Sequence, residues 1–305
     1  MGKFTEFEYP SKGAGTIHAY RWEPEGRPIA VFQIIHGIAE HAMRYDAFAR
    51  WLNARGYLVT AEDHMGHGKS QGSGAALYFE CGWLAAVDDS YALLCRTREA
   101  YPDLPYFLLG HSMGSFLART LLWRYPAAGL RAAVLCGTGW QNPVVLRAGR
   151  ALCAAERKRV GPKQDSSLLT RLVFGAYNGK FKDARSPNDW ICTDRAVVDA
   201  YTNDPMCGGN ATVGLIGDML GGIAMIQDKK NLDRMPKNLP VLFIAGYSDP
   251  VGNMSKGVKK TAEVFRAVGM KDVSVRFYDG RHEILNEPCR EQVFQDVEEF
   301  CRKQL

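Results

Sequence analysis

Short apolar runs and segments with helical spacing alternate along most of the chain. The apolar runs are rich in β-branched, aliphatic and aromatic residues, as buried strands are. The predicted strands cover residues 28–35, 57–61, 105–109, 131–136, 240–245 and 273–278. Apolar residues three and four positions apart predict helices over residues 45–52, 83–101, 115–124, 255–268 and 291–305. This alternation predicts an α/β fold with a mainly parallel sheet covered by helices on both faces.

The pattern departs from this alternation in two places. Residues 3–9 and 15–22 alternate apolar and polar positions, which predicts a half-exposed antiparallel pair of strands near the start of the chain. Between residues 138 and 233 there is no buried strand run. Four helical patches, separated by Gly, Pro and Asn, fill that stretch: 145–159, 167–174, 196–201 and 213–226. We therefore expect one core, made of residues 1–137 and 234–305, with a helical cap of residues 138–233 inserted into it.

The composition is that of an ordinary globular protein. The 305 residues are 46% hydrophobic and 23% charged, which is enough for a large core with an insertion. The net charge is +5, and no long Lys/Arg run with interleaved aromatics occurs, so we expect no nucleic-acid partner. The first residues lack the apolar core of a secretory signal, and no run is as long as a membrane span. The eight cysteines are scattered, which fits a reducing cytoplasm.

A Gly-x-Ser-x-Gly motif lies between a predicted strand and a predicted helix. It consists of Gly110, Ser112 and Gly114, with Met113 after the serine. In this context the motif predicts a nucleophile elbow, a turn so sharp that only glycine fits on either side of the serine. We therefore expect Ser112 to present its hydroxyl at the end of the sheet. The backbone N–H of Met113 would then point at an oxygen bound above it.

A serine nucleophile needs a base, and the base needs an acid that orients it. Asp249 follows the predicted strand 240–245, and His282 follows the strand 273–278. In an open α/β sheet the carboxyl ends of the strands form the site, so these side chains should meet Ser112 there. Three alternatives are that Asp249 is only a turn residue before a proline, that Asp279 is the acid, and that His282 has a structural role. We prefer Asp249 because Asp279 is too close to His282 in sequence to come from a separate strand end.

The second oxyanion donor should come from the loop after the strand 28–35. In the sequence His36-Gly37-Ile38, the glycine allows the turn and the N–H of Ile38 can face the site. Glu40 and His41 are expected to brace this loop.

Two other binding chemistries are less consistent with the sequence. Gly68-Lys69-Ser70 ends like a phosphate-binding P-loop, but Asp63 stands where the first glycine of that motif is required. A metal site would have to draw on four histidines whose spacing matches no common ligand motif: His36, His41, His64 and His67. We therefore expect neither a metal nor a cofactor.

Taken together, these motifs resemble those of the monoacylglycerol lipase/lysophospholipase branch of the α/β-hydrolases, the serine aminopeptidase S33 type. The motifs that carry the resemblance are His36-Gly37-x-x-Glu40-His41, Asp63-His64-x-Gly66-His67-Gly68-x-Ser70, Gly110-His111-Ser112-Met113-Gly114, Asp249-Pro250-Val251 and Gly280-x-His282-Glu283. The resemblance implies an eight-stranded core, a helical cap after the sixth strand and cofactor-free hydrolysis of carboxylic esters. It assigns Ser112 as nucleophile, His282 as base and Asp249 as its orienting acid. It makes Ile38 and Met113 the oxyanion donors.

The cap carries weaker signals. Asp189-Trp190, Asn203-Asp204-Pro205 and Cys207-Gly208 resemble cap features of the same family. Residues 218–226 are apolar on most sides and could line an acyl tunnel, touch a membrane surface or pack on the core. A basic stretch between Arg147 and Lys163 could meet anionic headgroups or be a solvated helix face. Five residues are expected to bind substrate: Phe174, Tyr177, Met219, Leu220 and Ile223.

The function we expect is ester hydrolysis through an acyl-enzyme, with monoacylglycerol-like or lysophospholipid-like small-molecule substrates. A short-chain carboxylesterase is the main alternative. An aminopeptidase or amidase on the same fold would need an acidic pocket for a free amine. A ligand-binding protein that lost turnover would not need all three of Ser112, Asp249 and His282. Peripheral membrane contact through the cap remains open, and the sequence is silent on oligomeric state.

Overall fold

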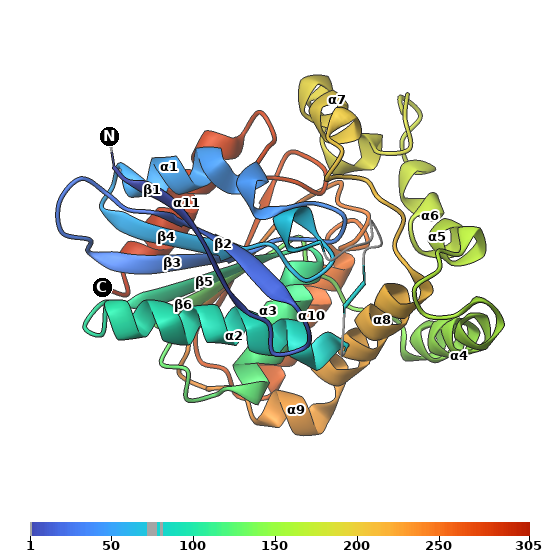
Figure 1. The fold of residues 1–305 in the computed structure, drawn as a ribbon, viewed down its shortest axis with the longest axis horizontal. Helices are drawn as coiled ribbons and strands as arrows, with labels where there is room; N and C mark the ends of the chain where they lie inside the picture. The colour runs from blue at the N-terminus through green and yellow to red at the C-terminus, as the bar shows by residue number, and fades with distance from the viewer. Residues whose placement is uncertain (1, 72–77, 80–81) are drawn as a thin grey trace.

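The computed structural model describes residues 2–71, 78–79 and 82–305. In this part of the chain, one eight-stranded sheet forms the centre of the molecule, with the strand order β1-β2-β4-β3-β5-β6-β7-β8 (Figure 1). The strands are β1 Phe4–Pro10, β2 Thr16–Trp22, β3 Ala30–Ile35, β4 Tyr57–Glu62, β5 Tyr106–His111, β6 Ala132–Cys136, β7 Val241–Gly246 and β8 Val273–Tyr278. The expected α/β-hydrolase architecture is confirmed.

Only the first strands of the sheet are antiparallel. β1 pairs with β2, and β2 with β4, in antiparallel fashion, while every pairing from β4 to β8 is parallel. The alternating pattern of residues 3–9 and 15–22 therefore corresponds to an antiparallel edge. The central strands β3, β4, β5, β6 and β7 are buried along their whole length. This burial explains their continuous apolar runs.

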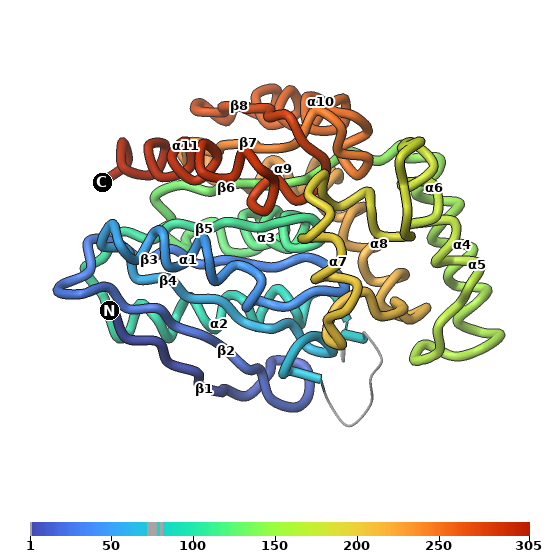
Figure 2. Tube along the Cα trace, turned by 90° about the horizontal axis from the view of Figure 1, so that it is seen from above, coloured from blue at the N-terminus to red at the C-terminus, as the bar shows by residue number. Residues whose placement is uncertain are grey.

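Helices cover both faces of the sheet (Figures 1 and 2). On one face, helices α1 (Asp46–Asn53) and α11 (Arg290–Arg302) pack on inward residues of the strands such as Phe32. On the other face, α2 (Trp83–Ala100), α3 (Met113–Arg124) and α10 (Lys256–Ala267) pack on the alternate residues, such as Val31. Because successive side chains of a strand point to opposite faces, each central strand contributes to both cores.

The chain between β6 and β7 is helical; most of it lies at one end of the sheet, on the right in Figures 1 and 2, while its last short helix lies nearer the middle of the molecule. Its helices are α4 Pro143–Val160, α5 Ser167–Val173, α6 Gly175–Asn178, α7 Arg195–Asn203, α8 Val213–Gln227 and α9 Lys229–Asp233. We refer to residues 138–233 as the helical insertion. Its apolar helix α8 packs against α2, α3 and α4, so this helix joins the insertion to the core.

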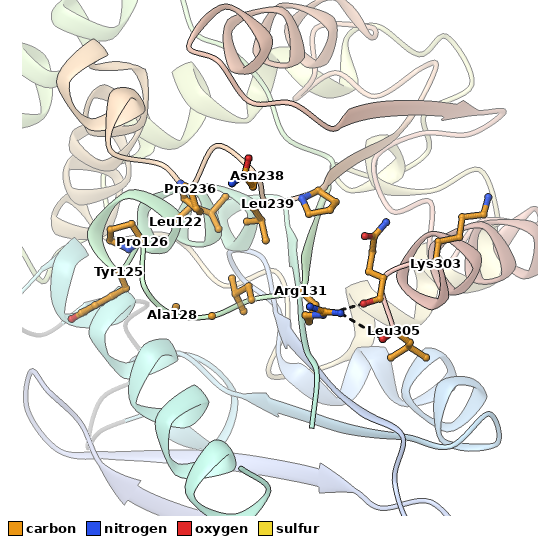
Figure 3. Close-up of a pocket in the computed structure, with 14 residues that line it drawn as sticks. Leu122, Tyr125, Pro126, Ala128, Arg131, Pro236, Asn238, Leu239, Lys303 and Leu305 are labelled. Atoms are coloured by element: carbon orange, nitrogen blue, oxygen red, sulfur yellow. Dashed lines mark hydrogen bonds between the residues drawn. The ribbon is translucent and has the colours of Figure 1, made fainter. Parts of the chain in front are cut away.

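The opposite end of the sheet contains a separate hollow of about 430 Å³ at the start of β6 and β7 (Figure 3). There Arg131 donates a hydrogen bond from Nε to the carbonyl oxygen of Gln304 at 3.0 Å, which holds the residues after α11 in place. This hollow lies at the amino ends of the parallel strands, away from the edge where α/β proteins bind their ligands. Within the described residues, no helix is both long and apolar enough to cross a membrane.

Candidate active site

Ser112 lies in a strained turn between β5 and α3. Its backbone has φ 52° and ψ −122°, a conformation that residues other than glycine rarely adopt. A Cβ on Gly110 would lie 2.3 Å from the carbonyl oxygen of Gly114. One on Gly114 would lie 2.1 Å from the carbonyl oxygen of Ile35. The two glycines therefore allow the sharp turn, as the motif predicts.

His282 and Asp249 meet at the same end of the sheet. His282 Nδ1 lies 2.9 Å from Asp249 Oδ1, and both side chains are buried. The same carboxylate oxygen accepts a hydrogen bond from the backbone N–H of Val251 at 2.8 Å, which fixes its direction. On the far side of the ring, His282 Nε2 has no hydrogen-bond partner among the described residues. Since His282 and Ser112 line one cavity, that nitrogen is available to a group bound beside the serine.

The loop after β3 lies beside Ser112. Ile38 lines the same cavities as the serine, and in the described part of the chain the N–H groups of Ile38 and Met113 donate to no protein acceptor. The neighbouring N–H of Gly37 instead donates to Glu40 Oε1 at 2.6 Å. Two backbone donors next to a nucleophilic serine form an oxyanion hole when both reach the same oxygen.

A buried cluster of charged side chains connects this loop with the loop that carries His282. Glu40 Oε2 accepts a hydrogen bond from Arg44 at 2.8 Å, and Arg44 also donates two hydrogen bonds of 2.6 Å to Glu283. Burial tends to raise the pKa of Glu40, but His111 and Arg44 outweigh it and hold the pKa well below its usual range. Burial also opposes protonation of His111, yet the Glu40 carboxylate raises the pKa of that imidazole above its ordinary value.

The histidines considered as metal ligands separate into two groups. His36, His64 and His67 stack closely, and the ring centroids of His36 and His64 are 4.0 Å apart. Their ring nitrogens contact backbone groups, and burial lowers the pKa of His64 to about 3 and of His67 to about 4. These values keep the two rings neutral near pH 7, so they serve as structural hydrogen-bonding groups beside the site.

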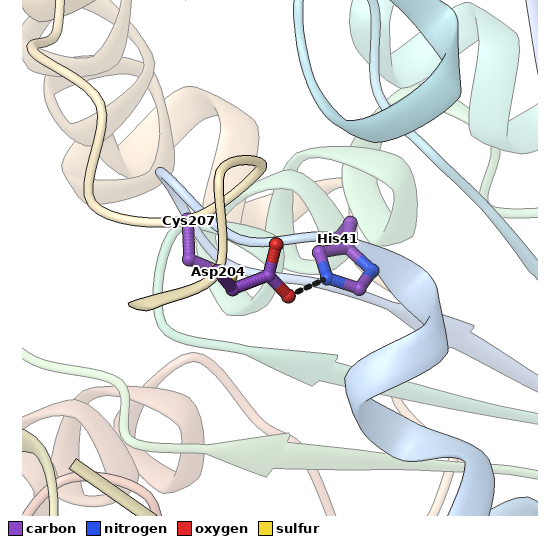
Figure 4. Close-up of side chains that lie close together, drawn as sticks. All are labelled: His41, Asp204 and Cys207. Atoms are coloured by element: carbon purple, nitrogen blue, oxygen red, sulfur yellow. Dashed lines mark hydrogen bonds and ion pairs between the residues drawn. The ribbon is translucent and has the colours of Figure 1, made fainter. Parts of the chain in front are cut away.

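His41 lies apart from that stack, with Asp204 and Cys207 of the helical insertion (Figure 4). His41 Nε2 is 2.9 Å from Asp204 Oδ2, and Asp204 Oδ1 accepts the N–H of Met206 at 2.8 Å. The Asp204 carboxylate is thus already occupied by hydrogen bonds within the protein. Sequence reasoning did not predict this contact, because 163 positions separate the two residues and no single motif contains both.

Two cavities meet at Ser112, and Ile38, Phe174 and Trp190 line both of them; they differ in how many polar side chains line them. The first, of about 680 Å³, is the polar chamber, whose lining includes Thr170, Arg171, Asn178, Asn188, Asn210 and Glu283. The second, of about 620 Å³, is the apolar chamber, whose lining includes Phe116, Leu146, Leu152 and all five of the expected substrate-binding residues: Phe174, Tyr177, Met219, Leu220 and Ile223. The polar lining residues were not predicted, since isolated polar residues in a helical segment give no signal.

Comparisons with known proteins show the family of the chain. The family model "Serine aminopeptidase, S33" matches residues 26–289. A monoacylglycerol lipase of Mycolicibacterium smegmatis is 30% identical over 305 residues, which cover 97% of each chain. The monoglyceride lipase of Mus musculus is 28% identical over 267 residues, 87% of this chain and 78% of the relative.

Solved structures give the same result. The structure of a highly thermostable carboxyl esterase from Bacillus coagulans, in complex with glycerol, superposes with a TM-score of 0.91 at 29% identity and covers 99% of both chains. A lipase in an open form superposes with a TM-score of 0.84 at 28% identity, again over 99% of both chains. The chain therefore belongs to the serine aminopeptidase S33 family of α/β-hydrolases, in the branch that contains the monoglyceride lipases.

Proposed function

We propose that this ester hydrolase cleaves monoacylglycerols, with the acyl chain in the apolar chamber and the glycerol in the polar chamber. The observation that carries the proposal is that two chambers meet at Ser112 and that only one of them is lined by many polar and charged side chains. An amphipathic ester placed across the serine puts its carbonyl at the hydroxyl and its polar half beside side chains that can form hydrogen bonds with it. The relatives named monoacylglycerol and monoglyceride lipase support the same substrate class.

The proposed mechanism uses the residues that the sequence singled out. His282 accepts the proton of Ser112 as the hydroxyl attacks the ester carbonyl, while Asp249 holds the imidazole in orientation. The N–H groups of Ile38 and Met113 stabilise the tetrahedral oxyanion, each by about 3 kcal/mol in comparable sites. The alcohol leaves with the proton from His282, and water then attacks the acyl-enzyme by the same route.

A second substrate class has support from Arg171. This side chain lines the polar chamber and is exposed, and no ion pair is found for it among the described residues. A guanidinium in the polar chamber is suited to binding the phosphate of a lipid headgroup, so we propose lysophospholipids as the alternative substrate. The polar chamber also has far more volume than a glycerol moiety requires. A short-chain esterase, an amidase and a ligand-binding protein remain outcomes of the experiment below.

We also propose that the helical insertion acts as a cap that meets a lipid surface. Helices α4 and α5 expose a set of large apolar side chains, with Val144, Val145, Leu168 and Leu172 between 47% and 64% accessible. Exposed apolar residues beside arginines are typical of peripheral membrane contact. Val144 and Leu168 line neither chamber. Replacing these two residues together by serine should therefore reduce sedimentation with anionic vesicles while leaving hydrolysis of a dispersed short-chain ester unchanged. Equal sedimentation of both proteins would refute this proposal.

The free thiols of the seven described cysteines favour a reducing compartment such as the cytoplasm.

The decisive experiment compares the native protein with Ser112→Ala on 1-monooleoylglycerol, lysophosphatidylcholine, p-nitrophenyl acetate and an oleoyl amide. We expect turnover of monooleoylglycerol above that of the other three, and loss of all turnover in the variant. Faster hydrolysis of the lysophospholipid would favour the alternative substrate. Turnover of acetate alone would indicate a short-chain esterase, and turnover of the amide an amidase. Ligand binding without turnover, or activity that survives in the variant, would overturn the mechanism.

A further inference from the structure

The loop after β3 carries Ile38, and we call it the oxyanion loop. It contains a second residue with a strained backbone, which the mechanism above does not use. Ala39, directly after Ile38, has φ 56°, in the left-handed region that residues other than glycine seldom occupy. Such a conformation persists only where surrounding contacts hold it. Because Ile38 and Ala39 share a peptide unit, the conformation of Ala39 affects the direction of the backbone next to the expected donor.

The contacts that hold Ala39 come from the helical insertion, far along the chain. Its carbonyl oxygen accepts a hydrogen bond from the Tyr201 hydroxyl at 2.9 Å and another from the Gly208 N–H at 2.9 Å. Two residues later, His41 Nε2 lies 2.9 Å from Asp204 Oδ2, the pair drawn in Figure 4. We call Tyr201, Asp204 and Gly208, at the end of α7 and in the turn after it, the α7 clasp.

The α7 clasp lies in a well-defined setting. Tyr201 is 8% exposed, and the Arg44 guanidinium lies over its ring at 4.8 Å from the centroid. The Asp204 carboxylate is fixed by the Met206 N–H as well as by His41. These contacts hold the donors in place before they reach the loop, so the clasp is preorganised rather than assembled from mobile side chains.

We propose that the α7 clasp is a positioning element for catalysis, which holds the oxyanion loop in its strained conformation so that the Ile38 N–H faces the reacting oxygen. The inference rests on the proposed function, because it concerns the same oxyanion hole. Tyr201 and Asp204 act through Ala39 and His41 and do not themselves touch the reacting atoms. The helical insertion thus contributes to the chemical step as well as to the lining of the chambers.

The position of the clasp also connects it with substrate. Tyr201, Gly208 and Ala39 all line the polar chamber, where the alcohol half of the ester is expected to lie. A substrate that fills this chamber packs against the residues that hold the loop. The loss of kcat in clasp variants should therefore be at least as large for esters with a bulky polar alcohol as for simple esters.

The test uses Tyr201→Phe, which removes one hydroxyl and retains the ring over Arg44. Since one hydrogen bond contributes about 1 kcal/mol, we expect kcat to fall about fivefold with KM unchanged. Asp204→Ala should lower kcat to a similar extent. Asp204→Asn keeps one of the two oxygen acceptors and should therefore restore part of the loss. The matched control is Tyr9→Phe, which removes a buried hydroxyl that also donates to a backbone carbonyl, Asp89 O at 3.0 Å, on β1 away from the site.

Two further readouts separate positioning from mere folding. Titration with a fluorophosphonate gives the fraction of protein with a reactive serine, and a trifluoromethyl ketone reports binding of an oxyanion formed on that serine. We expect full titration in every variant, with weaker ketone inhibition of Tyr201→Phe in proportion to its loss of kcat/KM. Unchanged ketone affinity per titrated site, or an equal loss in Tyr9→Phe, would overturn the clasp. If the native protein itself fails to react with the fluorophosphonate, the proposed function fails instead.

Discussion

The apolar chamber leads to a quantitative expectation for acyl-chain length. Gly149 on α4 lines this chamber, and a Cβ built on it would meet only Leu220 Cδ1, at 3.3 Å. That atom is the end of a flexible side chain, and Gly149 has ordinary helical geometry. A leucine at position 149 can therefore enter the chamber without displacing the backbone.

The size of the effect follows from the methylenes that the new side chain excludes. Each buried methylene contributes about 0.8 kcal/mol, or about fourfold in kcat/KM when it is bound in the transition state. Leucine adds four carbon atoms at this position, so chains that fill the chamber should lose the burial of about four methylenes. We expect Gly149→Leu to lower kcat/KM about 200-fold for palmitate and to leave acetate unchanged.

The assay is a series of p-nitrophenyl esters from acetate to palmitate, measured for native protein, Gly149→Leu and a matched control. Gly221→Leu is that control, because a Cβ on Gly221 meets nothing within 4 Å and Gly221 does not line the apolar chamber. Both changes replace a helical glycine, so each should raise helix stability by up to about 1 kcal/mol. An equal loss at every chain length, or undiminished palmitate turnover, would refute the assignment of this chamber to the acyl chain.

Three further expectations concern the core and the site. Asp249→Asn should lower kcat about 10⁴-fold with little change in KM, because the amide no longer selects the required tautomer of His282. Gly114→Ala should cost about 3 kcal/mol in urea unfolding, since its Cβ would lie 2.1 Å from a backbone oxygen, whereas Gly221→Ala should not. Burial raises the pKa of Glu62 from 4.5 to about 8, so only the unfolded state ionises between these values and native stability falls as pH rises through that range. Glu62→Gln should therefore gain about 2 kcal/mol over native protein between pH 6 and pH 8 in urea unfolding, and a pH-independent difference would contradict this.

The residues that could be found from the sequence are those fixed by local structure. Ser112 lies in a turn whose glycines are adjacent in sequence, and Asp249 and His282 follow strands that the apolar runs identify. Residues that line the apolar chamber could also be predicted from the sequence, because Phe174 and Ile223 belong to helical patches with apolar faces. In each case the determining pattern is local, and for Ser112, Asp249 and His282 it is combined with the rule that parallel strands end at one edge.

The features that could not be predicted depend on contacts between distant segments. The pairing of His41 with Asp204 joins the loop after β3 to a turn in the helical insertion, and no periodic pattern relates them. Similarly, Glu283 accepts two hydrogen bonds from Arg44, which lies in a segment far from it in the sequence. The short helices α6 and α9 were also missed, since helices of four or five residues give no measurable period.

The sheet order explains why two strained residues are needed side by side. β3 lies next to β5, with Ile35 opposite Gly110, so the loop after β3 emerges directly beside the strained turn that carries Ser112. A regular continuation of both strands would turn their N–H groups toward neighbouring strands, as in any sheet. Only a departure from regular geometry at Ala39 and Ser112 turns backbone donors toward a bound substrate. The flanking glycines of the core accommodate Ser112, whereas the carbonyl oxygen of Ala39 accepts hydrogen bonds from Tyr201 and Gly208 of the insertion. If the α7 clasp acts as we propose, an insertion that changes substrate choice must also preserve these contacts with the oxyanion loop.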